Sequence, residues 1–155
     1  MILGIDVSKD KVDVALFDVK SSLGSGRFDN TEAGFKKLGK WLKNKAGAEV
    51  WACLEASGRY GDDLAEYLFN AGHQVSIVNP AQIKKYAESQ LRRNKNDKLD
   101  AVVIADFCRT QEPSVWSPPT PQQKELQAMS RRLDALIEQQ TRCYEPSYLK
   151  NFWPI

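Results

Sequence analysis

Residues 2–18 read ILGIDVSKDKVDVALFD. Residues 2–8 and 11–18 of this segment are two short apolar runs rich in Val, Ile, Leu and Phe, as is typical of β-strands. Lys9 and Asp10 separate the two runs and favour a tight turn. The segment therefore predicts a β-hairpin at the start of the chain.

Asp6 places a charge inside the first apolar run of this hairpin. A buried carboxylate is unfavourable unless it is paired or binds a metal, so we expect Asp6 to have a specific purpose. Gly4, two residues earlier, would allow another element to approach the backbone closely.

The segments after the hairpin alternate between strand and helix patterns. The Ser/Gly-rich residues 21–26 predict a turn, and Asn30 or Thr31 can cap a helix. Strand patterns cover residues 27–28, 50–54 and 74–78, and helical patterns cover about residues 31–46, 64–69, 80–91 and 97–110. This order, three strands followed by alternating helices and strands, predicts an α/β fold. Its sheet would be antiparallel at one side and parallel at the other.

The composition is that of a globular protein with one domain of ordinary size. The chain has 155 residues, of which 42% are hydrophobic and 27% charged. It contains no apolar run of about 18 residues and no recognisable signal peptide, so we expect a cytoplasmic protein without a membrane span. The net charge of +2 does not by itself indicate a nucleic-acid partner.

The cysteines and the single histidine do not suggest a zinc site. Cys53, Cys108 and Cys143 form no CxxC pair, and His73 is the one histidine. We expect Cys53 and Cys108 to be small core residues, and His73 to have a surface or capping role.

Glu55 lies at the carboxyl end of the strand predicted for residues 50–54. In α/β sheets this end of a strand borders the ligand crevice. Asp6 lies near the corresponding end of the first strand, so the two carboxylates would meet if these strands are parallel neighbours.

Asp97 and Asp100 are three residues apart at the start of a predicted helix. This spacing places both on one face, with Cβ atoms about 5–6 Å apart. Ala101, Ile104 and Cys108 continue the same stripe, which would face the sheet. The alternative is that the two aspartates only complement the helix dipole, as acidic residues in a first turn often do.

Together, Asp6, Glu55, Asp97 and Asp100 are candidate metal ligands and catalytic residues. Clustered carboxylates without His or Cys suit Mg²⁺ or Mn²⁺. One or two such ions would serve phosphodiester chemistry by activating the attacking oxygen and stabilising the leaving oxygen.

Basic residues concentrate just before Asp97, where Tyr86 is interleaved and Glu88 and Asp97 oppose them. The candidate nucleic-acid-binding residues are Lys84, Lys85, Arg92, Arg93, Lys95 and Lys98. A basic strip beside a metal site would hold a phosphate backbone. The alternative is a solvated helix face.

The C-terminal part begins with a Pro-rich linker, residues 113–121, after a catalytic domain at residues 1–112. Residues 122–143 predict an amphipathic helix, and residues 144–155 form a tail without a periodic pattern. The apolar residues of this predicted helix recur at heptad-like spacing, at Leu126, Met129, Leu133 and Leu136 or Ile137. Two heptads are fewer than a coiled coil requires, so this helix either packs on its own domain or links subunits or a second domain.

Four motifs, in order over about residues 1–110, resemble one family of proteins. They are GIDVSKDKVDVALFD at residues 4–18, EASGRY at 55–60, VNP at 78–80 and KNDKLDA at 95–101. Together they resemble the DEDD-type insertion-sequence transposases (the insertion sequence one-ten family), which also contain the pilin-gene invertases.

The resemblance implies a ribonuclease-H-like fold related to Holliday-junction resolvases, with a mixed five-stranded sheet in the order 3-2-1-4-5. It implies that the D-E-D-D metal ligands are Asp6, Glu55, Asp97 and Asp100. It further implies a DNA recombinase of a mobile element, directed in many members by a structured RNA that the element encodes. Such proteins act as dimers or tetramers.

Two departures from the family pattern stand out. Asn96 replaces the usual Thr, which bears on hydrogen bonding around the metal ligands. The serine-containing C-terminal domain of the family is absent from these 155 residues. We therefore expect this chain to bind metal and nucleic acid without recombining DNA alone, and strand transfer by the isolated chain would contradict this.

Two other classes of protein compete with this interpretation. Actin-like sugar kinases also open with a G-I-D strand and a hairpin, but they need a Gly/Thr-rich phosphate loop that Ser8-Lys9-Asp10 does not provide. The second alternative is a nucleic-acid-binding or dimerisation module without activity of its own.

Overall fold

The computed structural model describes residues 1–18, 21–47, 49–56, 60–90 and 97–143, with residues 97–100 and 142–143 described as backbone alone. The chain divides into two compact units, Met1–Ser117 and Pro118–Ile155. Among the described residues, no helix combines the length and the apolar character that crossing a membrane requires.

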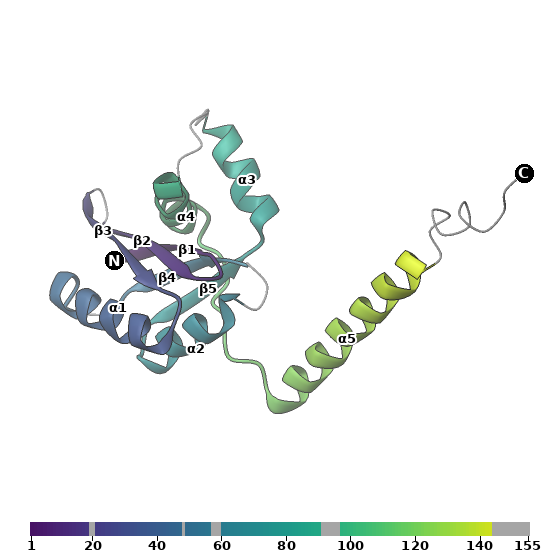
Figure 1. Ribbon diagram of the computed structural model, residues 1–155. Coiled ribbons are helices and arrows are strands. Elements are labelled where there is room, and N and C mark those ends of the chain that lie inside the picture. The colour runs from purple at the N-terminus through teal and green to yellow at the C-terminus, as the bar shows by residue number, and fades with distance from the viewer. Residues whose placement is uncertain (19–20, 48, 57–59, 91–96, 144–155) are drawn as a thin grey trace, which may run out of the picture. The chain divides into compact units, whose positions relative to one another are not determined.

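The first unit is built on one five-stranded sheet (Figure 1) with the order β3-β2-β1-β4-β5. The strands are β1 Ile2–Val7, β2 Lys11–Phe17, β3 Ser22–Asp29, β4 Trp51–Glu55 and β5 Gln74–Val78. β1 pairs antiparallel with β2 and parallel with β4, and β4 pairs parallel with β5. The predicted hairpin, the mixed sheet and the strand order 3-2-1-4-5 are therefore confirmed.

Helices cover both faces of this sheet. The helices of the first unit are α1 Glu32–Lys45, α2 Asp62–Asn70, α3 Pro80–Ser89 and α4 Asp97–Gln111. Figure 1 shows α1 and α2 on one face and α3 and α4 on the other. The second unit contains α5, Pro121–Cys143.

The alternation of side chains along β1 divides the core into two layers. Leu3, Ile5 and Val7 are buried in the layer that includes the apolar side chains of α1 and α2. Gly4 lies against α4 instead, so Asp6, two residues later, lies on this same face. Cys53 from β4 is buried in this second layer with side chains of α3 and α4.

Local signals in the sequence set the helix boundaries. The side chain of Thr31 accepts a hydrogen bond from the backbone of Gly34 and caps α1. Asn79 caps α3 in the same way, with Pro80 in its first turn. Gly72, just after α2, has a φ of 88°, which a residue without Cβ adopts easily.

The turn predicted for residues 21–26 is wrong. Residues 22–26 belong to β3, which pairs with β2 from Lys11↔Asp29 to Phe17↔Ser22. Their Ser and Gly content disfavours a strand, but the long apolar strand β2 supplies a full set of backbone partners. Gly24, with a φ of 144°, lies beside the irregularity in register near Leu16.

Candidate functional site

Asp6 and Glu55 lie side by side at the carboxyl end of a parallel strand pair. The register of β1 and β4 runs from Ile2↔Trp51 to Ile5↔Leu54, and these two carboxylates follow in the next position. Both residues are partly exposed. Neighbouring strands are about 4.8 Å apart, so the predicted meeting of the two carboxylates agrees with the observed register.

Helix α4 lies directly on β1 at Gly4. A Cβ atom built at Gly4 would overlap the carbonyl oxygen of Ala101 and lie 2.5 Å from the backbone nitrogen of Ala105. The close approach expected at Gly4 is thus made by α4. Ala101, Ile104 and Cys108 are buried, so the predicted stripe does face the sheet.

Asp97 and Asp100 occupy the first turn of α4, just before Ala101. At 1.5 Å per residue, Asp97 is about 6 Å along the helix axis from Ala101. The backbone of this turn therefore lies within one turn of the contact with Gly4. The side chains of both aspartates fall outside the described part of the structure, so their role as ligands remains a prediction.

The carboxylate oxygens of Asp6 and Glu55 suit a hard divalent cation. Adjacent carboxylates on one face repel each other, and a cation bound between them would relieve that repulsion. Carboxylate oxygens are the ligands that Mg²⁺ and Mn²⁺ prefer. Among the described side chains, no group of three or more His, Cys, Asp or Glu could hold a metal. Asp97 and Asp100, two of the four predicted ligands, are not among the described side chains.

The basic strip is described only in part. Lys84 and Lys85 are exposed on α3, and Lys98 lies in the first turn of α4, described as backbone. Arg92, Arg93 and Lys95 lie outside the described residues. The strip therefore remains a prediction as a whole.

Tyr86, which interrupts the strip, has a packing role. Its hydroxyl donates a hydrogen bond to Asp106 Oδ2 at 2.9 Å, and its ring packs edge-to-face on Phe107 of α4. Burial raises the pKa of the Tyr86 phenol. The side chain thus connects α3 to α4.

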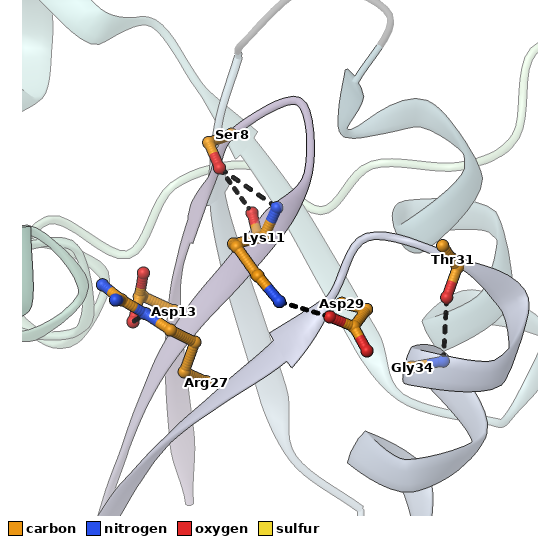
Figure 2. A network of polar contacts seen from close by, with 7 residues as sticks. All are labelled: Ser8, Lys11, Asp13, Arg27, Asp29, Thr31 and Gly34. Carbon is orange, nitrogen blue, oxygen red and sulfur yellow. Dashed lines mark hydrogen bonds and ion pairs between the residues drawn. The ribbon is translucent and has the colours of Figure 1, made fainter.

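The structure also shows charged and polar residues near this edge that the sequence pattern did not single out. Arg27 Nε donates to Asp13 Oδ1 at 2.7 Å (Figure 2), and Asp13 is the register partner of Asp6. The alternation in residues 11–18 could have placed Asp13 on the Asp6 face once the hairpin register was known.

Asn30 is a second residue of this kind. Its side-chain nitrogen donates to the backbone oxygens of Ser8, at 2.9 Å, and Tyr60, at 3.0 Å. It therefore connects the turn after β1 with the segment that follows Glu55. No local pattern in the sequence indicates these long-range contacts.

Cys53 and Cys108 are both free and fully buried, which confirms their predicted place in the core. A hydrogen bond with the Cys108 thiol, together with burial, raises the pKa of Cys53. His73 is also structural, because its Nδ1 accepts the Val50 backbone N–H at 3.4 Å.

The sequence of this chain is similar to the sequences of known transposases and a pilin gene-inverting protein. The model of the DEDD transposase family of insertion sequence IS110, described as "Transposase", matches residues 3–146. The pilin gene-inverting protein of Moraxella bovis is 32% identical over 146 residues, covering 90% of this chain and 45% of that protein. The transposase for insertion sequence element IS1328 of Yersinia enterocolitica is 31% identical over 79 residues, covering 51% of this chain and 22% of that protein.

The fold has a solved counterpart in RuvC of Thermus thermophilus. The two structures superpose with a TM-score of 0.53 at 14% identity, over 74% of this chain and 99% of RuvC. This likeness shows a ribonuclease-H-like fold. The chain spans about half the length of the pilin gene-inverting protein that it matches. With the family model matching nearly the whole chain, the protein belongs to the IS110-type family of DEDD transposases.

Proposed function

We propose that this chain is the catalytic domain of a DNA transposase or site-specific recombinase of a mobile element. Its DNA strand cleavage and transfer would take place at Asp6, Glu55, Asp97 and Asp100. The observation that carries the proposal is the adjacency of Asp6 and Glu55 at the carboxyl end of β1 and β4, on the face covered by α4. Family membership supports this function over that of an actin-like sugar kinase.

The four carboxylates would hold Mg²⁺ or Mn²⁺. Such an ion, when bound, polarises the phosphodiester and activates the attacking oxygen. Asp6 and Glu55 are fixed on paired strands, whereas Asp97 and Asp100 come from a helix whose position depends on Gly4. The side chains of the basic strip, beginning with the exposed Lys84 and Lys85 of α3, would hold the phosphate backbone.

The partners of the complete protein are part of the proposal. They are DNA, a structured RNA encoded by the element, and further copies of the chain in a dimer or tetramer. Because this chain spans 45% of the pilin gene-inverting protein, recombination would need more than these residues. The chain by itself would bind metal and nucleic acid.

The second candidate is a nucleic-acid-binding or dimerisation module without activity of its own. The row of exposed apolar side chains on α5 favours it. The two candidates differ in what they require of Glu55, because a pure binding module has no use for a metal ligand at the end of β4.

Calorimetric titration with Mn²⁺ tests the proposal. We expect wild-type protein to bind Mn²⁺ and Glu55→Ala to lose this binding. Asp63→Ala, which removes an exposed carboxylate of α2, should bind Mn²⁺ like wild type. Equal Mn²⁺ affinity in wild type and Glu55→Ala would favour the binding module instead.

A further inference from the structure

A row of charged side chains extends from the proposed site across the hairpin. In the antiparallel register, Asp13 of β2 is opposite both Asp6 of β1 and Arg27 of β3. Directly opposite residues share one face of a sheet. Four neighbouring strands therefore carry, in order, Arg27, Asp13, Asp6 and Glu55 on the face that α4 covers.

The contact between Arg27 and Asp13 fixes the orientation of the guanidinium group. Arg27 Nε donates to Asp13 Oδ1 at 2.7 Å, and the two side chains lie against each other in Figure 2. The Asp13 side chain is 16% exposed, whereas that of Arg27 is 54% exposed. An ion pair with this much exposure contributes little to stability, but it holds an arginine in a defined position at the surface.

A pocket opens at this ion pair. Its volume is about 370 Å³, and the residues that line it are Asp13, Val14, Ser25, Gly26, Arg27 and Ala101. Pockets that take small ligands have volumes of about 300–1,000 Å³. Ala101 lies one helical turn after Asp97, so the pocket borders the same part of α4 as the proposed metal site.

We propose that this pocket is a phosphate-binding subsite for the nucleic-acid strand, in which Arg27 contacts a backbone phosphate and Asp13 is a positioning residue for Arg27. Guanidinium groups suit phosphate because they donate parallel hydrogen bonds in one plane. Arg27 and Asp6 are separated by two strand spacings, about 10 Å. This inference rests on the proposed function.

The salt dependence of binding tests the contact with Arg27. The full 155-residue chain is titrated with a fluorescein-labelled single-stranded 30-mer of DNA in EDTA, at several NaCl concentrations. Each phosphate contact contributes about 0.7 to the slope of log K against log [salt] for single strands. We expect Arg27→Gln to weaken binding about five- to tenfold and to lower the slope by this amount.

The matched control is Lys36→Gln, which removes an exposed cation that pairs with Glu32 on α1, at the opposite face of the sheet. It should leave both the slope and the affinity close to those of wild type. Arg27→Lys, which keeps the charge, should retain the slope. A thermal melt of each variant verifies that it is folded.

Asp13→Asn tests whether Asp13 positions Arg27 or only places a negative charge beside the phosphate. Removing a negative charge beside a phosphate would by itself tighten binding, whereas releasing Arg27 from its partner would weaken it. We expect weaker binding. Tighter binding in Asp13→Asn would overturn the positioning role of this carboxylate.

The outcomes distinguish this inference from the proposed function. If wild type binds the DNA and Arg27→Gln keeps the wild-type slope, the subsite is wrong and the proposed function stands. If wild type does not bind the DNA at any salt concentration, the subsite is wrong, and the Mn²⁺ titration alone decides the proposed function. Because EDTA removes divalent metal, and the four carboxylates are the same in every variant compared, the differences between variants do not depend on metal binding.

Discussion

Gly4 is the residue on which the position of α4 depends. The carbonyl oxygen of Ala101 and the backbone of Ala105 occupy the space that a Cβ atom would need, and backbone atoms of a helix cannot rotate away as a side chain can. Any larger residue at this position must displace α4 from β1, and with it the turn that carries Asp97 and Asp100.

We therefore predict that Gly4→Ala lowers the free energy of unfolding by about 1–3 kcal/mol or more, as overpacking does, and also weakens Mn²⁺ binding. Urea unfolding and calorimetry measure the two effects. Gly47→Ala is the control, because Gly47 has a φ of 64° and nothing within 4 Å of a built Cβ. Gly47→Ala should be destabilised through backbone strain alone and should keep the Mn²⁺ affinity of wild type. Unchanged Mn²⁺ affinity in Gly4→Ala would contradict the role of α4.

The environment of His73 in the folded protein predicts that the free energy of unfolding depends on pH. Desolvation lowers the pKa of His73 below its ordinary value, and its Nδ1 accepts a backbone hydrogen bond, so the folded protein favours the neutral ring. As the pH falls through about 6.5, the unfolded chain takes up a proton more readily than the folded one, and stability decreases.

The test of this effect is thermal unfolding of wild type and His73→Asn between pH 7.5 and pH 5. Asn retains an acceptor near the position of Nδ1 but does not titrate. We expect the loss of stability across this range to be smaller in His73→Asn. An identical pH dependence in the two proteins would show that other groups cause it.

The sequence singled out Asp6 and Gly4 because each differs from its surroundings, as a charge and a glycine in an apolar strand. The structure confirms the close approach at Gly4, and the role of Asp6 as a ligand stays a prediction. The sequence does not mark Asp13 and Arg27 as site residues, for the opposite reason. Asp13 looks like an ordinary polar position of an alternating strand, and Arg27 follows a Ser/Gly-rich segment. Their pairing depends on the register of β2 and β3, which short-range patterns do not specify.

At the scale of elements, Asn30 connects segments that are distant in sequence. Its hydrogen bonds to the backbone oxygens of Ser8 and Tyr60 hold the turn after β1 near the segment after β4. These are the two segments that follow Asp6 and Glu55. The contact thus stabilises the edge of the sheet at which the proposed site lies.

Asn30→Ala should lower the free energy of unfolding by about 1–2 kcal/mol, because the side-chain hydrogen bonds to the backbone oxygens of Ser8, Lys9 and Tyr60 are lost. Urea unfolding measures this change. Asn70→Ala, at an exposed position at the end of α2, should have a smaller effect. Equal stability of Asn30→Ala and wild type would mean that these hydrogen bonds are exchanged for water without cost.

Helix α5 carries a row of apolar side chains at heptad-like spacing. They are between 51% and 68% exposed, namely Leu126, Met129, Leu133, Leu136 and Ile137. Contiguous exposed apolar side chains mark sites of interaction. We predict that a second copy of the chain covers it, in agreement with the oligomer proposed for the complete protein.

Sedimentation equilibrium tests this association. We expect wild type to self-associate as its concentration rises, and Leu133→Lys to remain monomeric. Gln127→Lys adds the same charge at an exposed position of α5 outside the row, and should associate like wild type. Monomeric wild-type protein at high concentration would contradict the prediction.

At the scale of the whole molecule, the sequence predicted most of the fold because its patterns agree with one another. The strands near Asp6 and Glu55 are apolar runs with clear ends, and Thr31, one of the two expected capping residues, caps α1. The exception was β3, whose Ser and Gly residues form a strand because β2 provides a partner. Tertiary pairing of this kind cannot be derived from local propensity.

We expect Asp6, Glu55 and the first turn of α4 to form one divalent-metal site together. Paramagnetic broadening of backbone amide NMR signals by substoichiometric Mn²⁺ tests it most directly. We predict simultaneous broadening around Asp6, around Glu55 and in the first turn of α4, and loss of all three effects in Asp6→Ala. Broadening confined to the first turn of α4, or unchanged in Asp6→Ala, would contradict the claim.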